Sequence, residues 1–217
     1  MGASVNKQYL KLAGFPLLLH TLQVFQAEPL IGEIILVVGE AEISRCKAKI
    51  VDPYGLSKIR SIIAGGKERQ DSINRGLQVL ADDCQWVVVH DGARPLLIDE
   101  VLRRTIQAAQ EWDAAVAAVP TKDTIKVAGP KELVQSTLDR RSLWSIQTPQ
   151  VFKRSLLVKA YAQAYADCFY GTDDASLVER IGAPVKLVRG SYENLKVTTP
   201  EDLDIAEAVL KRRRQKA

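Results

Sequence analysis

Short apolar runs rich in valine and isoleucine alternate along the chain with longer segments of helical periodicity. The apolar runs are typical of buried strands and predict strands over residues 33–38, 58–64, 86–90, 114–120, 184–190 and 194–198. The periodic segments predict helices over 17–26, 41–50, 68–81, 98–112, 154–166 and 173–182, and a last helix capped by Thr199. Strands that alternate with helices in this way favour an α/β fold, with a mostly parallel sheet flanked by helices.

One segment interrupts the alternation. Residues 121–147 read as two polar strands around the turn at Gly129 and Pro130, and they are too hydrophilic to lie in a core. We expect a projecting β-arm that contacts something outside the chain, often another subunit. Because no linker or internal repeat accompanies it, residues 1–217 are interpreted as one domain that contains this arm for dimerisation.

Composition narrows the functional class. The 217 residues are 47% hydrophobic, which is enough for a sizeable core, and 30 Lys and Arg against 26 Asp and Glu give a net charge of +4. This balance is too mild to indicate nucleic acid, and the terminal KRRRQK is interpreted as a solvated helix end. No apolar run reaches the roughly 18 residues of a membrane span. The three scattered cysteines read as buried thiols of a reducing compartment, so we expect a cytoplasmic protein without membrane or nucleic-acid partners.

The stretch VVVHDGARP, residues 87–95, carries the first candidate chemistry. Three valines form a buried strand, and Asp91, Gly92 and Arg94 follow at its carboxyl end, where open parallel sheets bind ligands. A carboxylate there can hold Mg²⁺ together with substrate phosphates, and an arginine beside it can bind phosphate. The alternative is that Asp91 and Arg94 pair locally and only shape the turn; spacing alone favours neither.

Weaker signals lie elsewhere in the chain. SIIAGGKERQDS, residues 61–72, places two glycines before a helix whose first amides suit an anion or a base edge, although a glycine pair is more often a tight turn. Charges and hydroxyls at the base of the arm are compatible with a solvated face. Thr172 can be a helix cap, whereas Lys196 follows an apolar residue at a predicted strand end and needs an anionic partner.

The motifs KQYL, GGKERQDS, VVVHDGARP, KDTIK, LDRRSLWSIQTPQVF, TDDAS and NLKVTTPEDL occur in one order. In this respect the chain closely resembles the 2-C-methyl-D-erythritol 4-phosphate cytidylyltransferases of the non-mevalonate isoprenoid pathway, from its first residue to about residue 210. The resemblance implies a Rossmann-like nucleotidyltransferase sheet and transfer of CMP from CTP to methylerythritol phosphate, which yields 4-diphosphocytidyl-2-C-methyl-D-erythritol and pyrophosphate. It also implies Mg²⁺ as cofactor and a homodimer joined through the arms.

The resemblance also assigns roles to individual residues. By similarity, Asp91 would bind the metal and the ribose, Lys7 would stabilise charge on the triphosphate, and Lys196 would act at the reacting phosphates. The nucleotide would further contact Gly66, Ser72 and Gly92. The methylerythritol phosphate side would be lined by Arg94, Thr148, Thr172 and Lys196, with Thr124 and Arg140 supplied by the partner's arm.

One departure concerns the beginning of the chain. The family normally starts with an apolar strand that leads into a glycine-rich loop, A-A-G-x-G-x-R-M-G, and only Met1 and Gly2 match its end here. We therefore expect that the start was assigned at an internal methionine, that two neighbouring strands have unpaired edges, and that this chain has little activity. The upstream coding sequence tests the first expectation: an in-frame stop with no glycine-rich segment before it would refute it.

Two other functions remain open at this stage. A cytidylyltransferase for another polyol phosphate, such as ribitol 5-phosphate, would share every residue on the CTP side. A catalytically impaired nucleotide-binding homologue is the second alternative. The expected location is the bacterial cytoplasm, or the plastid stroma if the source is a plant or alga.

Overall fold

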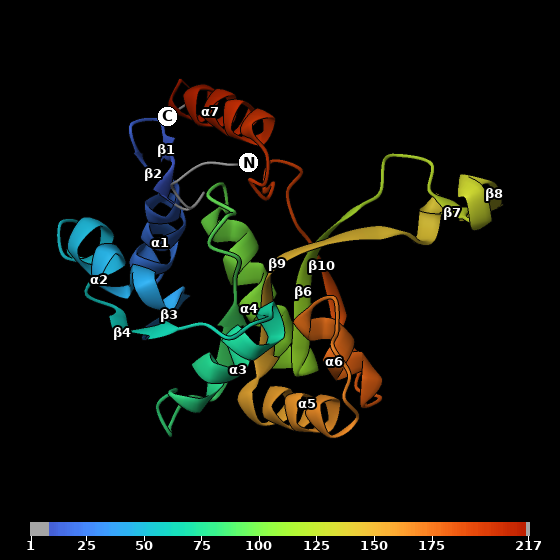
Figure 1. The fold of residues 1–217 in the computed structure, drawn as a ribbon, viewed down its shortest axis with the longest axis horizontal. Helices are drawn as coiled ribbons and strands as arrows, with labels where there is room; N and C mark the ends of the chain where they lie inside the picture. Colours follow the sequence, from blue (N-terminus) through green and yellow to red (C-terminus); the bar gives the residue numbers. More distant parts are fainter. Residues whose placement is uncertain (1–8, 216–217) are drawn as a thin grey trace.

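The computed structural model describes residues 9–215, and its larger sheet has four strands (Figure 1). The strand order is β10 (Lys186–Arg189), β6 (Ala114–Pro120), β9 (Trp144–Lys153) and β5 (Trp86–Val89). β10 runs parallel to β6, while β9 runs antiparallel to both β5 and β6. Three of the four strands therefore share one direction, and the sheet is mixed because β9 opposes them.

Two more strands, β3 (Ile34–Val38) and β4 (Ile59–Ala64), pair in parallel as a separate sheet. Within residues 9–215, β3 pairs only with β4, and β5 pairs only with β9. One edge of each therefore has no strand partner in the described part of the chain.

The centre of the molecule is β6, the sequence AAVAAVP, whose first six residues are buried. Ala114 and Val116 belong to a core cluster formed with α5 (Arg154–Ala166) and α6 (Asp174–Arg180). Ala115 and Ala117 belong to a second cluster on the opposite face, formed with α1 (Leu17–Ala27) and α4 (Asp99–Trp112). Small side chains on both faces let helices approach the sheet closely, so the molecule has three layers and the predicted α/β class is confirmed.

The remaining helices follow the predicted periodicity with one irregularity. They are α2 (Ile43–Cys46), α3 (Arg69–Gln78) and α7 (Pro200–Arg214). The segment predicted as one helix over 41–50 is a 3-10 turn, the short α2 and a π-helical turn over Lys47–Val51. Thr199 caps α7 as expected, because its side chain accepts a hydrogen bond from the Asp202 amide.

One strand prediction was wrong, and one strand was missed. Residues 194–198 form a loop rather than a strand. The long strand β9 was not predicted, because Pro149 and the polar residues Gln147, Thr148 and Gln150 break the apolar pattern of its buried part. Their polar atoms are hydrogen-bonded inside the protein: Gln150 donates to Asp173 at 2.8 Å, and Thr148 accepts through its carbonyl oxygen.

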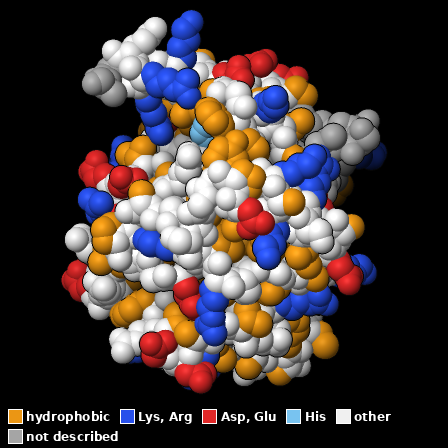
Figure 2. Space-filling model, turned by 90° about the vertical axis from the view of Figure 1, so that its left-hand side faces the viewer, with side chains coloured by type: hydrophobic (Ala, Val, Ile, Leu, Met, Phe, Trp, Pro, Cys, Tyr) orange, Lys and Arg blue, Asp and Glu red, His pale blue; other side chains and the backbone are white. Residues whose placement is uncertain are grey.

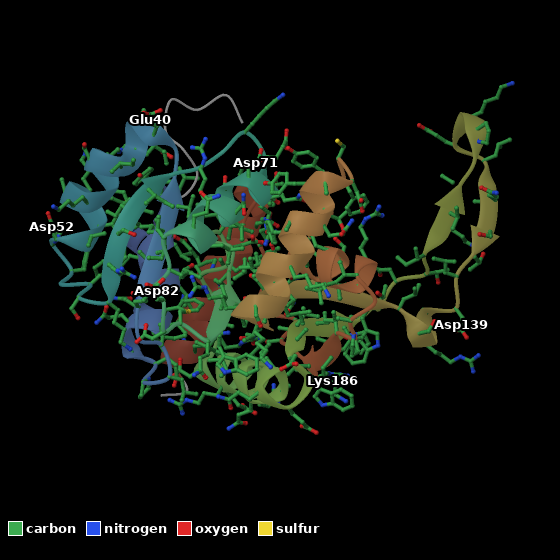
Figure 3. The ribbon with its side chains drawn as sticks, turned by 90° about the horizontal axis from the view of Figure 1, so that it is seen from below. Glu40, Asp52, Asp71, Asp82, Asp139 and Lys186 are labelled. Atoms are coloured by element: carbon green, nitrogen blue, oxygen red, sulfur yellow. The ribbon has the colours of Figure 1, made fainter. Side chains whose placement is uncertain are left out.

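The predicted β-arm is present as β7 (Lys126–Ala128) and β8 (Val134–Thr137), which pair antiparallel around a turn at Pro130–Glu132. It extends away from the layers in Figure 1, and Figure 3 shows it from below with Asp139 on it. The last residues of the predicted range, 144–147, belong instead to β9, and Gln147 is buried. The tip carries exposed apolar side chains, with Leu133 68% and Val134 63% exposed.

Glu28, directly after α1, links the two sheets. Its buried carboxylate accepts a hydrogen bond at 2.7 Å from the Arg103 guanidinium of α4, and its backbone oxygen accepts one at 2.6 Å from Lys58, which precedes β4. A buried carboxylate needs such a partner because burial removes its hydration. Glu28 therefore ties both parts of the sheet system to one point.

The structure tests three expectations that came from composition: the distribution of charge, the burial of the cysteines and the absence of a membrane span. Basic and acidic side chains are interspersed over the face shown in Figure 2 rather than gathered into one basic patch. All three cysteines are free, but only Cys46 is buried; Cys168 is exposed, so the expectation of three buried thiols was wrong for it. No helix among residues 9–215 has the length and apolar character needed to cross a membrane.

We expect Glu28→Gln to lower the free energy of unfolding by about 1–2 kcal/mol, because the charge-assisted bond to Arg103 is lost in a buried place. Urea unfolding followed by circular dichroism measures this loss. The matched control is Glu100→Gln, whose carboxylate is 71% exposed and pairs with Arg104 along α4. That control should change stability by less than about 0.5 kcal/mol; equal losses in the two variants would contradict the linking role of Glu28.

Candidate active site

A cleft of about 450 Å³ opens where the carboxyl end of β5 meets β9 and the loop before α7. Its walls come from segments far apart in the sequence. It is lined by Arg69, Asp91, Arg94, Ile146, Gln147, Thr148, Gln150, Thr172, Asp173, Ser176, Glu179 and Lys196. Five residues predicted for the site, Asp91, Arg94, Thr148, Thr172 and Lys196, are therefore brought together here.

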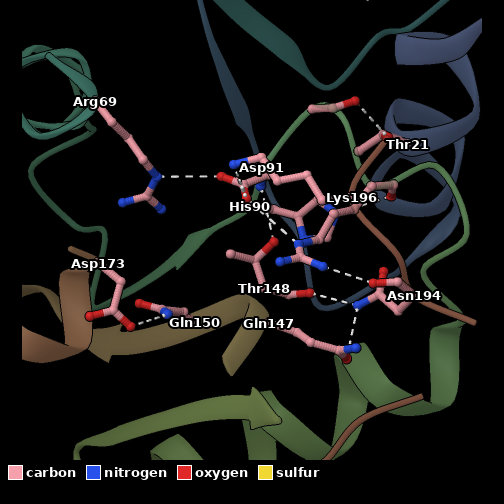
Figure 4. Close-up of polar contacts among 12 residues, drawn as sticks. Thr21, Arg69, His90, Asp91, Gln147, Thr148, Gln150, Asp173, Asn194 and Lys196 are labelled. Carbon is pink, nitrogen blue, oxygen red and sulfur yellow. Dashed lines mark hydrogen bonds and ion pairs between the residues drawn. The ribbon is translucent and has the colours of Figure 1, made fainter. Parts of the chain in front are cut away.

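Three cations surround Asp91 (Figure 4). Lys196 Nζ lies 3.0 Å and Arg94 Nε 3.6 Å from one carboxylate oxygen, and Arg69 Nε lies 3.3 Å from the other. The side chain of Asp91 is 15% exposed, so it still opens to the cleft. Local pairing of Asp91 with Arg94, the alternative left open by the spacing, is thus only one of three contacts.

Burial alone would raise the pKa of Asp91, but Lys196, Arg69 and Arg94 together hold it below its ordinary value. Asp91 is therefore ionised at neutral pH. The neighbouring His90 is uncharged at neutral pH, because burial lowers its pKa to about 4. The cleft lining holds three cations and the three carboxylates of Asp91, Asp173 and Glu179, and the cations gather at Asp91, where an anionic ligand can contact them.

Arg69 connects the start of α3 to two carboxylates. Besides Asp91, it contacts Asp174 of α6 at 2.8 Å, and the Asp174 carboxylate is nearly fully buried. Tyr161 of α5 donates a hydrogen bond to the same carboxylate. Burial would lower the pKa of Arg69, but Asp174 and then Asp91 raise it. This network fixes α3 against the α5–α6 pair and holds Arg69 at the edge of the cleft.

Thr148 on β9 and the first residues before α6 form the opposite wall. The Asp91 amide donates to Thr148 Oγ1 at 3.1 Å, which fixes the end of β5 against β9. Across the cleft Asp173, and not Thr172, caps α6 by accepting a hydrogen bond from the Ser176 amide. Thr172 lines the cleft instead. The alternative reading of Thr172 as a helix cap was therefore wrong.

Gly66 and Ser72, predicted for the nucleotide, lie beside each other at the start of α3, where the Gly66 amide donates to Ser72 Oγ at 3.0 Å. A Cβ on Gly66 would lie 2.2 Å from Asp71 Cβ, so this close turn requires glycine. Gly92 follows Asp91, and its carbonyl oxygen accepts a hydrogen bond from Thr21 of α1 at 3.0 Å. These three residues flank the cleft rather than line it.

The other predicted residues lie elsewhere. Thr124 and Arg140 are exposed at the foot of the arm, and the Arg140 guanidinium donates to the Lys122 carbonyl oxygen at 3.1 Å. Neither lines the cleft of its own chain. Lys7 lies outside the described residues.

Sequence reasoning missed Arg69, Asp174 and Asn194. Arg69 stands inside GGKERQDS, Asp174 inside TDDAS and Asn194 two residues before Lys196, so all three belong to stretches that were already recognised. The available signal was a charged or amide residue next to a predicted site residue. Their roles depend on partners more than 20 residues away, which spacing does not reveal.

Asp91 is the residue that could hold a metal ion. Among residues 9–215 no group of three or more His, Cys, Asp or Glu side chains is arranged to hold one. Asp91, Asp173 and Glu179 are the carboxylates that line the cleft, and the ionised Asp91 lies where the cations gather. One such carboxylate fits Mg²⁺, which commonly takes one or two carboxylates and completes its shell with phosphates and water.

Comparisons with known proteins extend these observations. A family model described as 2-C-methyl-D-erythritol 4-phosphate cytidylyltransferase matches residues 1–212. The enzyme of that name from Alkaliphilus metalliredigens is 49% identical over 214 residues, which covers 99% of this chain and 89% of that protein. The one from Syntrophus aciditrophicus is 49% identical and covers 98% of this chain and 91% of that protein.

Solved structures agree. The 4-diphosphocytidyl-2C-methyl-D-erythritol synthase from Anaerococcus prevotii superposes with a TM-score of 0.87 at 33% identity, covering 94% of this chain and 93% of that one. The 2-C-methyl-D-erythritol 4-phosphate cytidylyltransferase from Thermus thermophilus gives a TM-score of 0.80 at 33% identity, with coverage of 94% and 93%. Fold, cleft and sequence thus agree, and the chain belongs to the 2-C-methyl-D-erythritol 4-phosphate cytidylyltransferase family.

Proposed function

We propose that this chain transfers CMP from CTP to 2-C-methyl-D-erythritol 4-phosphate, giving 4-diphosphocytidyl-2-C-methyl-D-erythritol and pyrophosphate. The observation that carries the proposal is the carboxylate of Asp91 between three cations at the carboxyl end of β5. The reaction joins two polyanions, so the protein must supply positive charge and position. Family membership supports the choice of nucleotide and acceptor.

In this mechanism an oxygen of the acceptor phosphate attacks the α-phosphorus of CTP, and pyrophosphate leaves from the opposite side. Lys196 and Arg94 bind the acceptor phosphate and lower its repulsion toward the nucleotide. Thr148 and Thr172 donate hydroxyl hydrogen bonds to the same substrate. Lys7 neutralises charge that grows on the leaving pyrophosphate.

The cytidine end is assigned to the turn before α3. The Gly66 amide and Ser72 hydroxyl, paired with each other at 3.0 Å, turn to the cytosine edge when the base binds. Gly92 would contact the nucleotide through its backbone beside Asp91. The absence of a Cβ there also lets the turn pack against α1, because a Cβ would lie 2.9 Å from Leu18 Cδ1. Asp91 accepts a hydrogen bond from the ribose.

Mg²⁺ is the proposed cofactor, with Asp91 as its protein ligand. When bound, it would neutralise the triphosphate and withdraw charge from the α-phosphorus. Asp91 would hold the ion, with Lys196 and Arg94 beside the same carboxylate. Both cations would bind the acceptor phosphate.

The proposed assembly is a homodimer through the β-arm, residues 121–147. The arm carries exposed apolar side chains at its tip and the exposed Thr124 and Arg140 at its foot. Thr124 and Arg140 would reach the acceptor side of the partner's cleft. We assign the reaction to a reducing compartment such as the bacterial cytoplasm, where the three unpaired cysteines stay as thiols.

A substrate panel tests the reaction directly. We expect pyrophosphate release with CTP, Mg²⁺ and methylerythritol phosphate at least about tenfold faster than with ribitol 5-phosphate, because the acceptor pocket discriminates by hydrogen bonds. The two acceptors are compared with each other at the same enzyme and CTP concentrations. Preference for ribitol 5-phosphate would support the alternative enzyme, and no turnover together with no CTP binding would refute the proposal.

Nucleotide binding tests the role of Asp91 separately. CTP with Mg²⁺ should raise the melting temperature, and Asp91→Asn should remove the part of that shift that depends on Mg²⁺, since the metal ligand is lost. The control is Asp139→Asn, an exposed arm carboxylate that pairs with Arg141. Its CTP response should match the parent chain; an unchanged response in Asp91→Asn would exclude Asp91 as the metal ligand.

Sedimentation velocity tests the arm. Leu133→Asp should convert a dimer into a monomer, because it introduces a charge at a side chain that is 68% exposed on the isolated arm. Ile205→Asp on α7, at a residue 52% exposed, is the matched control and should leave the dimer intact. A dimer that survives Leu133→Asp would show that the arm tip is not the interface.

A further inference from the structure

Asn194 is a fully buried amide beside the cleft, and the proposed reaction does not use it. It lies in the loop between β10 and α7 with 0% exposure. Its side-chain amide donates to the Thr148 carbonyl oxygen at 2.8 Å and to Gln147 Oε1 at 3.5 Å. Its backbone oxygen accepts a hydrogen bond from the Arg94 guanidinium at 2.8 Å. Asn194 thus contacts two other segments, strand β9 and the turn after β5.

These contacts form a closed ring around the cleft. Asn194 binds Thr148 of β9, Thr148 Oγ1 accepts from the Asp91 amide at 3.1 Å, and Arg94 returns from the β5 end to Asn194. Figure 4 shows Asp91, Thr148, Gln147 and Asn194 along this path. β5 and β9 already pair as strands, and Asn194 ties the loop before α7 to both of them.

Lys196 is the residue that this arrangement places. Its side chain is 40% exposed and spans from the loop to Asp91 at 3.0 Å. A long exposed lysine loses considerable rotamer entropy when held in one place, and an exposed ion pair alone stabilises weakly. The backbone is fixed on both sides instead: by Asn194, and by buried Val197, whose amide donates to the Ala93 carbonyl oxygen at 2.8 Å.

The chemistry of the position requires an asparagine-like donor. Both groups facing its Nδ2 are oxygen acceptors, so an aspartate there would present oxygen to oxygen in a buried place. An alanine would leave the Thr148 carbonyl oxygen without this donor. Each change removes the side-chain bond from Asn194 to β9, so that Gln147, which donates to the Ser191 carbonyl oxygen at 2.9 Å, is left as the link between the loop and β9. The apolar core around β6 stays outside the altered contacts.

We propose that Asn194 is a positioning residue, whose amide fixes the loop 190–197 so that Lys196 stands against Asp91 and meets the acceptor phosphate. The part that concerns the phosphate rests on the proposed function. The placement of Lys196 does not, and it can be measured without turnover.

Lysine labelling measures that placement. The full chain and the variants Asn194→Ala and Asn194→Asp are treated with trace acetic anhydride, and acetylation at each lysine is quantified by mass spectrometry. We expect Lys196 to react about fivefold faster in both variants, because its contact with Asp91 opens more often. Lys58, held by the Glu28 carbonyl oxygen at 2.6 Å, reports global opening and should stay within about twofold.

Kinetics supply the second readout. Asn194→Asp should raise KM for methylerythritol phosphate by about tenfold or more and leave KM for CTP within about twofold, because only the acceptor side is displaced. In a Lys196→Met background the same change should have almost no further effect on the acceptor KM, since the two residues act as one unit. Asn74→Ala, the loss of an amide in α3, controls for amide removal elsewhere.

Three outcomes would overturn the proposal. Lys196 labelling could stay at the parent rate in both variants. Lys58 could accelerate together with Lys196 in both, which would make Asn194 a general stability residue. The acceptor KM could rise by the same factor with and without Lys196. A chain without turnover would count against the proposed function alone, because the labelling result remains readable.

Discussion

The balance of charge around Asp91 is the constraint on which the cleft depends. A carboxylate at the buried end of a strand is costly unless cations approach it, and here they come from three parts of the chain: α3, the turn after β5 and the loop before α7. Buried polar contacts to neighbouring segments hold these parts in place.

Each cation has its own support. Arg69 is held by the buried Asp174 and, through it, by Tyr161, while Arg94 donates to the backbone of Asn194. Because an unpaired polar group in a low-dielectric place is expensive, these contacts favour one arrangement of Arg69 and Arg94. The result is a set of positive charges that needs little rearrangement when an anion arrives, and this preorganisation is what phosphate chemistry requires.

The sequence was sufficient for whatever depends on local pattern. β6 was predicted closely because it is a continuous apolar run, and α4 and α5 because their apolar residues recur at helical spacing. Asp91, Arg94 and Lys196 stood out as charges beside apolar runs. β9 was not predicted because its buried residues include Gln147 and Gln150, whose hydrogen-bond partners lie in other elements. Asn194 was not recognised for the same reason. A residue that acts through contacts to distant segments produces no periodic pattern in the sequence.

The β-arm follows a different constraint. Two strands of three and four residues make a hairpin that is marginal in water, and this one adds exposed Leu133 and Val134 at its tip. Neither the sheet nor a helix of the described chain covers that tip (Figure 1). A second copy of the chain would bury these side chains and stabilise the hairpin at once. Because Thr124 and Arg140 lie at the foot of the same arm, dimerisation and completion of the partner's cleft would then be a single event.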